Sequence, residues 1–500
     1  MTGRQPKRGP ARSSAGAPES DRQAQEIERL RQEIEQLRKE NAEQAKQIAD
    51  LERQLALRQQ NSTTSSKPPS SDGLAGRQRE RGRRMKSRRK PGGQLGHPGH
   101  CRKLVPPERV NEVVEVFPDA CGHCDHALSA RGRQVTGEPR RHQVTELPPI
   151  EAHIIEYQCP QVVCPVCGRT TQAPLPEEVD GQFGPQLTAL VAYLTVVCRL
   201  PRLLVQRLLE GALQIPISLG STQKAWEEAS AAVAVSYQEL EQALRDQPVL
   251  NCDETGHRTN GDKRWLWTLV APGYVFYLIA LSRGADVLTR VLGPVFAGIV
   301  GSDRLPTYLT YHKGRRQFCW AHFTRNLLSA QELATTAAAT RFCREALALQ
   351  AQLFRLWRRF RGDPHARGAP LTRQQLIAKA LPVEKKFFAL GERHVNAANR
   401  DVRNLARALF VHHEHFFRFL HEDSVDPTNN AAERALRTAV QWRKIMFGTR
   451  SAEGELAVAR LLTVTRTCQM QQLNALVYLT AAIRCYRRRQ VVASLLPKRP

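Results

Sequence analysis

The chain has 500 residues, and its 74 Lys and Arg outnumber its 48 Asp and Glu, which gives a net charge of +26 at pH 7. Such a length is too great for one hydrophobic core and predicts two to four domains, while the basic excess predicts a polyanionic partner. A polar, basic N-terminus argues against a secretory signal, and the apolar stretch Leu187–Cys198 is too short for the ~20 residues of a membrane span. We therefore expect a cytoplasmic protein whose twelve cysteines are mostly buried thiols rather than disulfides.

The N-terminal region is predicted to be a disordered tail over residues 1–22 and a coiled coil over residues 23–60. A strict heptad pattern runs from Ile27 to Leu55. The a positions are Ile27, Ile34, Asn41, Ile48 and Leu55, and the d positions are Leu30, Leu37, Gln44 and Leu51. Ile at a with Leu at d favours two parallel helices, with Asn41 fixing their register, so a homodimer is expected. The alternative is one amphipathic helix that packs on its own domain.

Residues 61–105 are predicted to be a Ser- and Pro-rich linker followed by a basic arm. From Arg77 to Lys90, nine of fourteen residues are Lys or Arg. An arm of this kind binds phosphates through counterion release and does not read base sequence. The arm residues predicted to contact DNA are Arg77, Arg79, Arg81, Arg83, Arg84, Lys86, Arg88, Arg89 and Lys90.

Residues 106–178 are predicted to form a zinc-binding β module. Cys121 and Cys124 form one CxxC pair, and Cys164 and Cys167 form another. Two such pairs can complete a closed, tetrahedral Zn²⁺ site of the structural type. Cys159 and His126 are competing ligands, and four buried cysteines without a metal are the other alternative. The β-rich runs expected in the module are Val113–Phe117 and His153–Tyr157.

Residues 179–245 are predicted to be helical. Leu203–Glu210 has apolar helical periodicity, and Gly211 is expected to end that helix. Ser218 or Ser221 is expected to cap a second helix. The pair forms a possible helix-turn-helix, or a helical hairpin that only packs.

The next segment, residues 246–330, is predicted to begin an α/β catalytic core. Three short β-rich runs separated by Gly and Pro predict a β-meander, and a helix and a fourth apolar run follow. These elements are Pro248–Leu250, Trp265–Val270, Tyr274–Ile279, Ala285–Leu292 and Phe296–Val300. Asp253 follows the first run and Asp303 follows the last, so both carboxylates are expected at strand ends.

A helical insertion is predicted over residues 331–424, because Arg341–Phe360 and Leu376–Phe388 show helical periodicity. The core is expected to resume over residues 425–465, where a helix beginning near Asp426 would carry Glu433. Residues 466–500 are predicted to be a C-terminal helical tail.

Three acidic residues are the candidate catalytic residues: Asp253 in NCDETGHR, Asp303 in GSDRLPTY and Glu433 in NNAAERALR. Mg²⁺ prefers oxygen ligands, and three carboxylates can hold two such ions for phosphodiester chemistry. Two carboxylates at strand ends and a third on a returning helix is the layout of an RNase H-like nuclease core. The alternative is that all three are solvated surface charges.

Two further residues are candidate neighbours of these carboxylates. His322 ends the segment QFCWAH and is a possible active-site neighbour. Arg437 lies at i+4 from Glu433 on the same helix face, where it would either bind a DNA phosphate or pair with Glu433.

Several motifs, in the same order along the chain, resemble the DDE transposases of the insertion-sequence-66 family. They are SSKPPSSD at 65–72, KPGGQLGHPGH at 90–100, CPVCG, DETG, QFCWAH at 317–322 and NNAAER. The resemblance covers almost the whole chain and implies a metal-binding triad at Asp253, Asp303 and Glu433. It also implies two Mg²⁺ or Mn²⁺ ions as cofactors. The RLPTY segment after Asp303 departs from many relatives, which leaves the roles of its neighbours open.

The activity implied by this resemblance is phosphodiester cleavage and strand transfer at the ends of an insertion sequence. Its partners would be element-end and target DNA, a second copy of the chain and element-encoded helper proteins, at the nucleoid. The expected fold is multidomain α+β: a coiled coil, a zinc-binding β module, a helical region and an RNase H-like core with an all-helical insertion. Two alternatives remain: a non-catalytic, dimeric, zinc-containing DNA-binding protein, and an RNase H-like nuclease without strand transfer.

Overall fold

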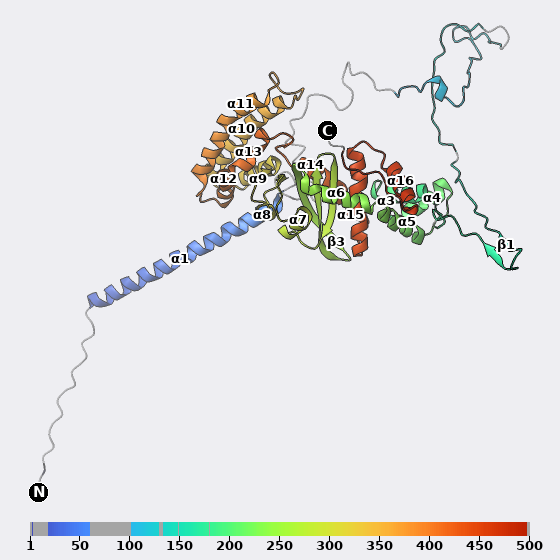
Figure 1. Ribbon diagram of the computed structural model, residues 1–500. Coiled ribbons are helices and arrows are strands. Elements are labelled where there is room, and N and C mark those ends of the chain that lie inside the picture. The colour runs from blue at the N-terminus through green and yellow to red at the C-terminus, as the bar shows by residue number, and fades with distance from the viewer. Residues whose placement is uncertain are drawn as a thin grey trace.

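The computed structural model describes residues 3, 19–60, 102–129, 134–148, 150–179 and 181–497 (Figure 1). Most of the predicted disordered tail lies outside the described residues, although its last four residues are helical. The nine DNA-contacting residues predicted in the basic arm, Arg77 to Lys90, also lie outside them.

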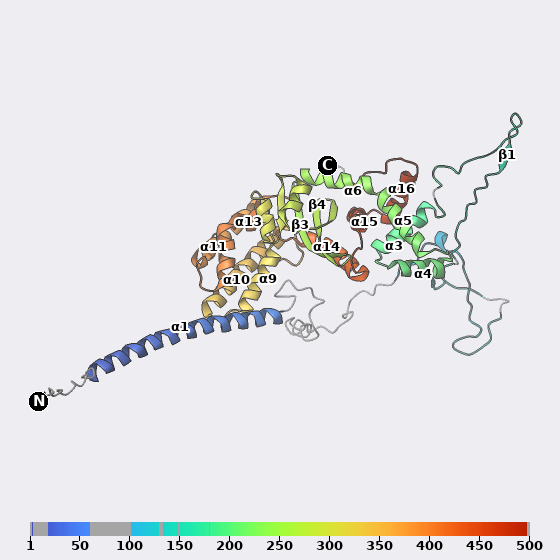
Figure 2. The same cartoon turned by 90° about the horizontal axis from the view of Figure 1, so that it is seen from below.

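The predicted N-terminal helix is present as α1, Glu19–Gln59. Figures 1 and 2 show that it projects away from the folded body and touches it only near its C-terminal end. There the Gln60 side chain donates a 2.7 Å hydrogen bond to the Ser329 hydroxyl. The apolar seam is about half exposed, with Leu30 at 48% and Ile34 at 49%. The helix therefore does not bury this seam on the rest of the described chain, and the coiled coil stays a prediction.

The described residues between 102 and 179 contain little regular structure: the 3-10 turn η2, Pro107–Arg109, and the antiparallel pair β1, Gln161–Val163, and β2, Thr170–Gln172. The prediction of strands at 113–117 and 153–157 is wrong for this structure. Both segments are extended without strand partners, and Val113 and Ile154 are almost fully exposed. Residues with β propensity form a strand only when a neighbouring strand pairs with them.

The helical region comprises α3, Pro185–Val196, α4, Arg202–Leu213, α5, Leu219–Ala232, α6, Ala234–Ala243, and the 3-10 turn η3, Leu244–Asp246. Of the two serines proposed as caps, Ser218 is the N-cap of α5, and its hydroxyl accepts a hydrogen bond from the Ser221 N–H. Gly211 does not end α4 as predicted, since the helix continues to Leu213 and Gln214 closes it in the left-handed conformation.

A five-stranded mixed sheet occupies the centre, with the order β5-β4-β3-β6-β7. The predicted meander is β3, Val249–Thr259, β4, Asp262–Ala271, and β5, Tyr274–Ala280, all antiparallel. The predicted helix is α7, Ala285–Leu292, and the fourth strand is β6, Ile299–Ser302, which begins three residues later than the apolar run. Both β6 and β7, Arg316–Phe318, run parallel to β3, and β7 has no counterpart among the predicted elements.

Two C-terminal helices return to the sheet. These are α14, Asn430–Met446, and α15, Ala452–Met470. On the edge strand β5, the N–H groups of Val275 and Tyr277 have no neighbouring strand to bond to. They donate instead to the Thr467 and Thr463 hydroxyls of α15. Threonines of α15 thus satisfy an edge that would otherwise lack partners.

The predicted boundary between core and C-terminal tail, at residues 465 and 466, falls inside α15. The helix that follows, α16, Ala475–Arg487, packs on α3 and α5. Its last residue, Arg487, forms a 2.7 Å ion pair with Glu228 of α5. The C-terminal residues therefore join the sheet to the helical region and are not a separate tail.

The insertion between β7 and α14 is helical, as predicted. Its helices are α9, Trp320–Glu332, α10, Ala337–Phe360, α11, Arg373–His394, α12, Arg400–Val411, and α13, His413–His421. They enclose a second hydrophobic core in which Trp320 contacts the rings of Phe323, Phe387 and Phe416. Figures 1 and 2 show this insertion on one side of the sheet and α3 to α5 on the other. Among the described residues, no helix has the length and apolar composition that crossing a membrane requires.

Candidate active site

Asp253 lies inside β3 and not at a strand end as predicted, because β3 continues to Thr259, whereas Asp303 directly follows the last residue of β6, the parallel neighbour of β3. β3 pairs with β6 so that Asn251 lies opposite Gly301. Each aspartate follows two residues later, and side chains two residues apart on a strand point to the same face. A Cβ at Gly301 would lie 2.6 Å from the Asn251 side-chain oxygen, so a larger residue there would have to displace the Asn251 amide. The register therefore sets Asp253 beside Asp303 on one face of the sheet, just beyond the end of β6.

Helix α14 carries the third carboxylate and is tied to β3 through Asn429. The buried Asn429 amide donates a 2.6 Å hydrogen bond to the carbonyl of Cys252, the residue before Asp253. The Asn429 backbone N–H donates to the Cys319 sulfur at 3.2 Å. Glu433 lies one turn further along α14, where its N–H donates to the Asn429 carbonyl. The first turn of α14, with Glu433, is thus held beside β3.

The electrostatics place the three carboxylates in one neighbourhood. Burial raises the pKa of Asp253 well above its usual range, and the carboxylates of Glu254, Asp303 and Glu433 raise it further. Like charges this close oppose one another's ionisation, and a divalent cation would remove that cost. An all-oxygen donor set of this kind fits Mg²⁺ or Mn²⁺.

His322, on the first turn of α9, lies against the third carboxylate. Its Nδ1 is 3.4 Å from Glu433 Oε1, and both atoms are buried without a hydrogen-bond partner among the described residues. Burial lowers the pKa of His322, and the opposing effect of Glu433 does not reverse this. A neutral imidazole therefore faces the carboxylate near pH 7.

A model of the transposase IS66 family matches residues 180–457, which is more than half of the chain and includes all three carboxylates. The chain belongs to the IS66 transposase family. A second model, of a family of unknown function, matches residues 17–103. An uncharacterized protein, y4qI of Sinorhizobium fredii (strain NBRC 101917 / NGR234), is 25% identical over 242 residues, which cover 44% of this chain and 43% of that protein. The chain thus spans less than half the length of this curated relative.

In this IS66 family member, a second buried acid, Glu254, directly follows Asp253 in β3. Glu254 Oε1 accepts hydrogen bonds of 2.9 and 2.7 Å from Arg283, and the Tyr308 hydroxyl donates to Oε2. Tyr308 belongs to α8, Pro306–Tyr311, which begins three residues after Asp303. Glu254 therefore links the strand of Asp253 to the helix that follows Asp303.

Sequence reasoning missed Glu254, Asn429 and Cys319 as parts of this site. Each directly adjoins, or lies within four residues of, a residue that was singled out. The signal available in the sequence was their position: each is a polar residue inside DETG, NNAAER or QFCWAH, the same motifs that carried the resemblance.

Arg437 is exposed on α14, and no ion pair joins it to Glu433 in the part of the chain that the structure describes. Glu433 faces His322 instead. Of the two roles considered for Arg437, pairing with Glu433 has no support among the described residues, and contact with a DNA phosphate stays a proposal.

The two CxxC pairs of this family member fold into matching turns. In the first, the Cys121 N–H donates to the His126 carbonyl and the Asp125 N–H donates to the Cys121 carbonyl. The second repeats both bonds between Cys164, Arg169 and Gly168. Asp125 and Gly168 both have positive φ, and hydrogen bonds from the following backbone N–H groups lower the pKa of Cys121 and Cys164.

Each turn is therefore shaped to present two thiolates, as a zinc knuckle does. The structure does not bring the two turns together. Among the described residues, the only group of three or more His, Cys, Asp or Glu ligand atoms within 4.8 Å of one another is Cys319, His322 and Glu433. A zinc ion shared by Cys121, Cys124, Cys164 and Cys167 stays a proposal.

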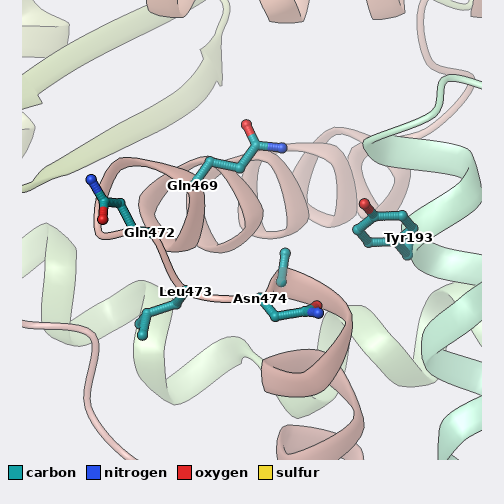
Figure 3. Close-up of a pocket in the computed structure, with 6 residues that line it drawn as sticks. Tyr193, Gln469, Gln472, Leu473 and Asn474 are labelled. Atoms are coloured by element: carbon teal, nitrogen blue, oxygen red, sulfur yellow. The ribbon is translucent and has the colours of Figure 1, made fainter. Parts of the chain in front are cut away.

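A cavity of about 360 Å³ lies away from the carboxylates, where α3 meets the turn between α15 and α16. Figure 3 shows Tyr193 on one side and Gln469, Gln472 and Asn474 on the other. Its lining contains amides, a phenol and aliphatic groups without a carboxylate, imidazole or thiol.

Proposed function

We propose that this chain is a DNA transposase that cuts the ends of its element and joins them to target DNA. The observation that supports the proposal is the register that sets Asp253 beside Asp303, with the start of α14, which carries Glu433, tied to β3, in a chain of the IS66 transposase family. The sheet order, with three antiparallel strands followed by two parallel ones, supports an RNase H-like catalytic core.

Asp253, Asp303 and Glu433 would hold two Mg²⁺ or Mn²⁺ ions. Bound there, the ions would supply an activated attacking oxygen and a stabilised leaving oxygen. The protein's own contribution is geometric. Asp253 is the central carboxylate of the three, because Asp303 and Glu433 both raise its pKa. Hydrogen bonds of Glu254 and Asn429 hold the strand of Asp253 against α8 and α14. His322 Nδ1 lies 3.4 Å from Glu433 Oε1 without a hydrogen bond between them among the described residues.

DNA binding in this proposal uses the basic arm, Arg77 to Lys90, and Arg437 beside the active site. Lys and Arg contacts to phosphates supply affinity without sequence information. The α1 seam would pair two chains and so bring two element ends together. The zinc knuckles would form a structural module next to the arm.

A cleavage and joining assay tests this function. Purified full-length protein, labelled DNA that carries the ends of its element, and a supercoiled target plasmid are incubated with Mg²⁺. The proposal expects nicks at the element ends and labelled DNA covalently joined to the plasmid. Nicks without joining would identify a nuclease without strand transfer. Stable end binding without either product, in Mg²⁺ and in Mn²⁺, would favour a non-catalytic DNA-binding protein.

A further inference from the structure

The N-termini of two helices meet beside the catalytic carboxylates. Cys319 is the N-cap of α9, and His322 is the third residue of the same helix. Glu433 is on the first turn of α14, whose N-cap is Asn429. The Cys319 sulfur, a His322 ring nitrogen and a Glu433 carboxylate oxygen all lie within 4.8 Å of one another. Three different donor types therefore converge on one point from two helices.

The Cys319 sulfur is placed to serve as a metal ligand. The side chain is 1% exposed, and its sulfur accepts the Asn429 backbone N–H at 3.2 Å. Burial raises the pKa of this thiol to about 11, and the Asn429 N–H and the positive end of the α9 dipole only partly oppose that rise. A metal ion that binds there therefore has to displace the thiol proton.

The other two donors face each other without a hydrogen bond. His322 Nδ1 and Glu433 Oε1 are buried, 3.4 Å apart, and neither has a hydrogen-bond partner among the described residues. Buried polar atoms normally have partners, so two orphaned atoms that point at one another require an explanation. A cation between them would bond to both.

Sulfur, nitrogen and oxygen together select a different ion from the all-oxygen triad. Zn²⁺ binds thiolate, imidazole and carboxylate in tetrahedral sites, whereas Mg²⁺ takes oxygen ligands. Glu433 belongs to both donor sets. An ion on the Cys319 side would hold Glu433 against α9 and withdraw it from Asp253 and Asp303.

We propose that Cys319, His322 and Glu433 form a site for a zinc-class divalent ion, and that an ion bound there inhibits DNA cleavage by taking Glu433 from the catalytic triad. The inhibitory half of this inference rests on the proposed function. The binding half does not, because it concerns these three side chains alone.

Cobalt spectroscopy tests the binding half without any need for activity. The full chain is used with Cys121, Cys124, Cys164 and Cys167 all changed to Ser, so that the knuckles contribute no sulfur. Co²⁺ addition is expected to give a near-ultraviolet thiolate-to-cobalt absorption band. Cys319→Ser in this background should abolish the band, and Cys343→Ser, which alters another buried cysteine in α10, should keep it. No band in the background protein, or a band that survives Cys319→Ser, overturns the site.

Zinc titration of cleavage tests the inhibitory half. At fixed Mg²⁺, Zn²⁺ should inhibit the wild-type chain, and Cys319→Ser should raise the half-inhibiting Zn²⁺ concentration by at least about tenfold, since loss of a ligand weakens metal binding at least as much as loss of a supporting residue. Cys343→Ser is the matched control and should be inhibited like the wild type. Equal inhibition of all three proteins would overturn the inhibitory role. If wild-type cleavage is absent while the cobalt band is present, the proposed function fails and the metal site stands.

Discussion

The amide of Asn429 donates a 2.6 Å hydrogen bond to the carbonyl of Cys252, which couples the start of α14 to the residue before Asp253. The same residue donates its backbone N–H to Cys319 at the start of α9. One buried asparagine thus joins the strand of the first carboxylate, the helix of the third and the helix that carries His322. The spacing of the candidate active site depends on this junction.

Asn429→Ala is therefore expected to impair catalysis more than stability. Loss of this amide leaves the buried Cys252 carbonyl without its hydrogen bond, which costs ~1–3 kcal/mol. An increase of that size in the activation free energy of cleavage, through a misplaced Glu433, slows the reaction by roughly ten- to a hundredfold. Single-turnover cleavage rates at saturating DNA measure this. Asn474→Ala is the matched control, because Asn474 caps α16 far from the carboxylates. Similar rates for both variants would show that Asn429 does not position the site.

The stability of the helical insertion should fall at acidic pH because of His415. Burial, then the nearby charges of Arg316, His412, Arg418 and His312, lowers the pKa of His415 from 6.5 to about 4. The unfolded chain then binds more protons than the folded one between these values. The stability contributed by neutral His415 is complete above pH 6.5 and is lost as the pH falls toward 4.

Urea denaturation followed by tryptophan fluorescence measures this loss, because Trp320 lies in the same core. His415→Gln cannot gain the proton, so its unfolding midpoint should fall less steeply between pH 7 and pH 4 than that of the wild type. Parallel curves would mean that His415 is not responsible.

The exposed seam of α1 predicts dimerisation. Leu30→Lys combined with Leu37→Lys places charges at two d positions and should lower the mass measured by light scattering to that of one chain. Gln32→Lys combined with Gln36→Lys adds the same charge away from the seam and should leave the dimer intact. A monomeric wild type, or a dimeric seam variant, would place dimerisation elsewhere or exclude it.

Zinc content tests the two knuckles. After dialysis without zinc, the full chain should retain about one zinc ion, because a closed four-thiolate site is the structural type. Cys121→Ser with Cys164→Ser removes one thiolate from each knuckle and should bring the zinc content close to zero. Cys198→Ser, at an exposed cysteine outside both pairs, should keep it. Unchanged zinc in the double variant would refute the shared site.

Local sequence patterns predicted the elements whose ends are marked by neighbouring residues in the sequence. Helix α7 matches its predicted range because Gly284 and Gly293 flank it. The apolar run that ends at Val300 placed Asp303 just beyond β6. The run before Asp253 did not give the end of β3, because that strand continues to Thr259 through its pairing with β4, and the hairpin closes at Asn260–Gly261 with positive φ at both positions.

Elements that depend on distant partners could not be predicted. Strand β7 has only three residues and forms because β6 is there to pair with it. Helix α15 crosses the expected domain boundary, because its threonines bond to β5 almost two hundred residues earlier. The roles of Asn429 and Cys319 depend on two helix starts meeting in space, which no local pattern encodes.

The central claim is that Asp253, Asp303 and Glu433 act together as one catalytic centre on DNA. The most direct measurement compares Mg²⁺-dependent cleavage of element-end DNA by the wild type, Asp253→Asn and Asp262→Asn, alongside their DNA affinities. Asp262 is an exposed aspartate at the start of β4, directly after the hairpin turn that ends β3. The account predicts that Asp253→Asn binds DNA like the wild type and cuts none of it, while Asp262→Asn cuts normally. Wild-type cleavage by Asp253→Asn would contradict the account.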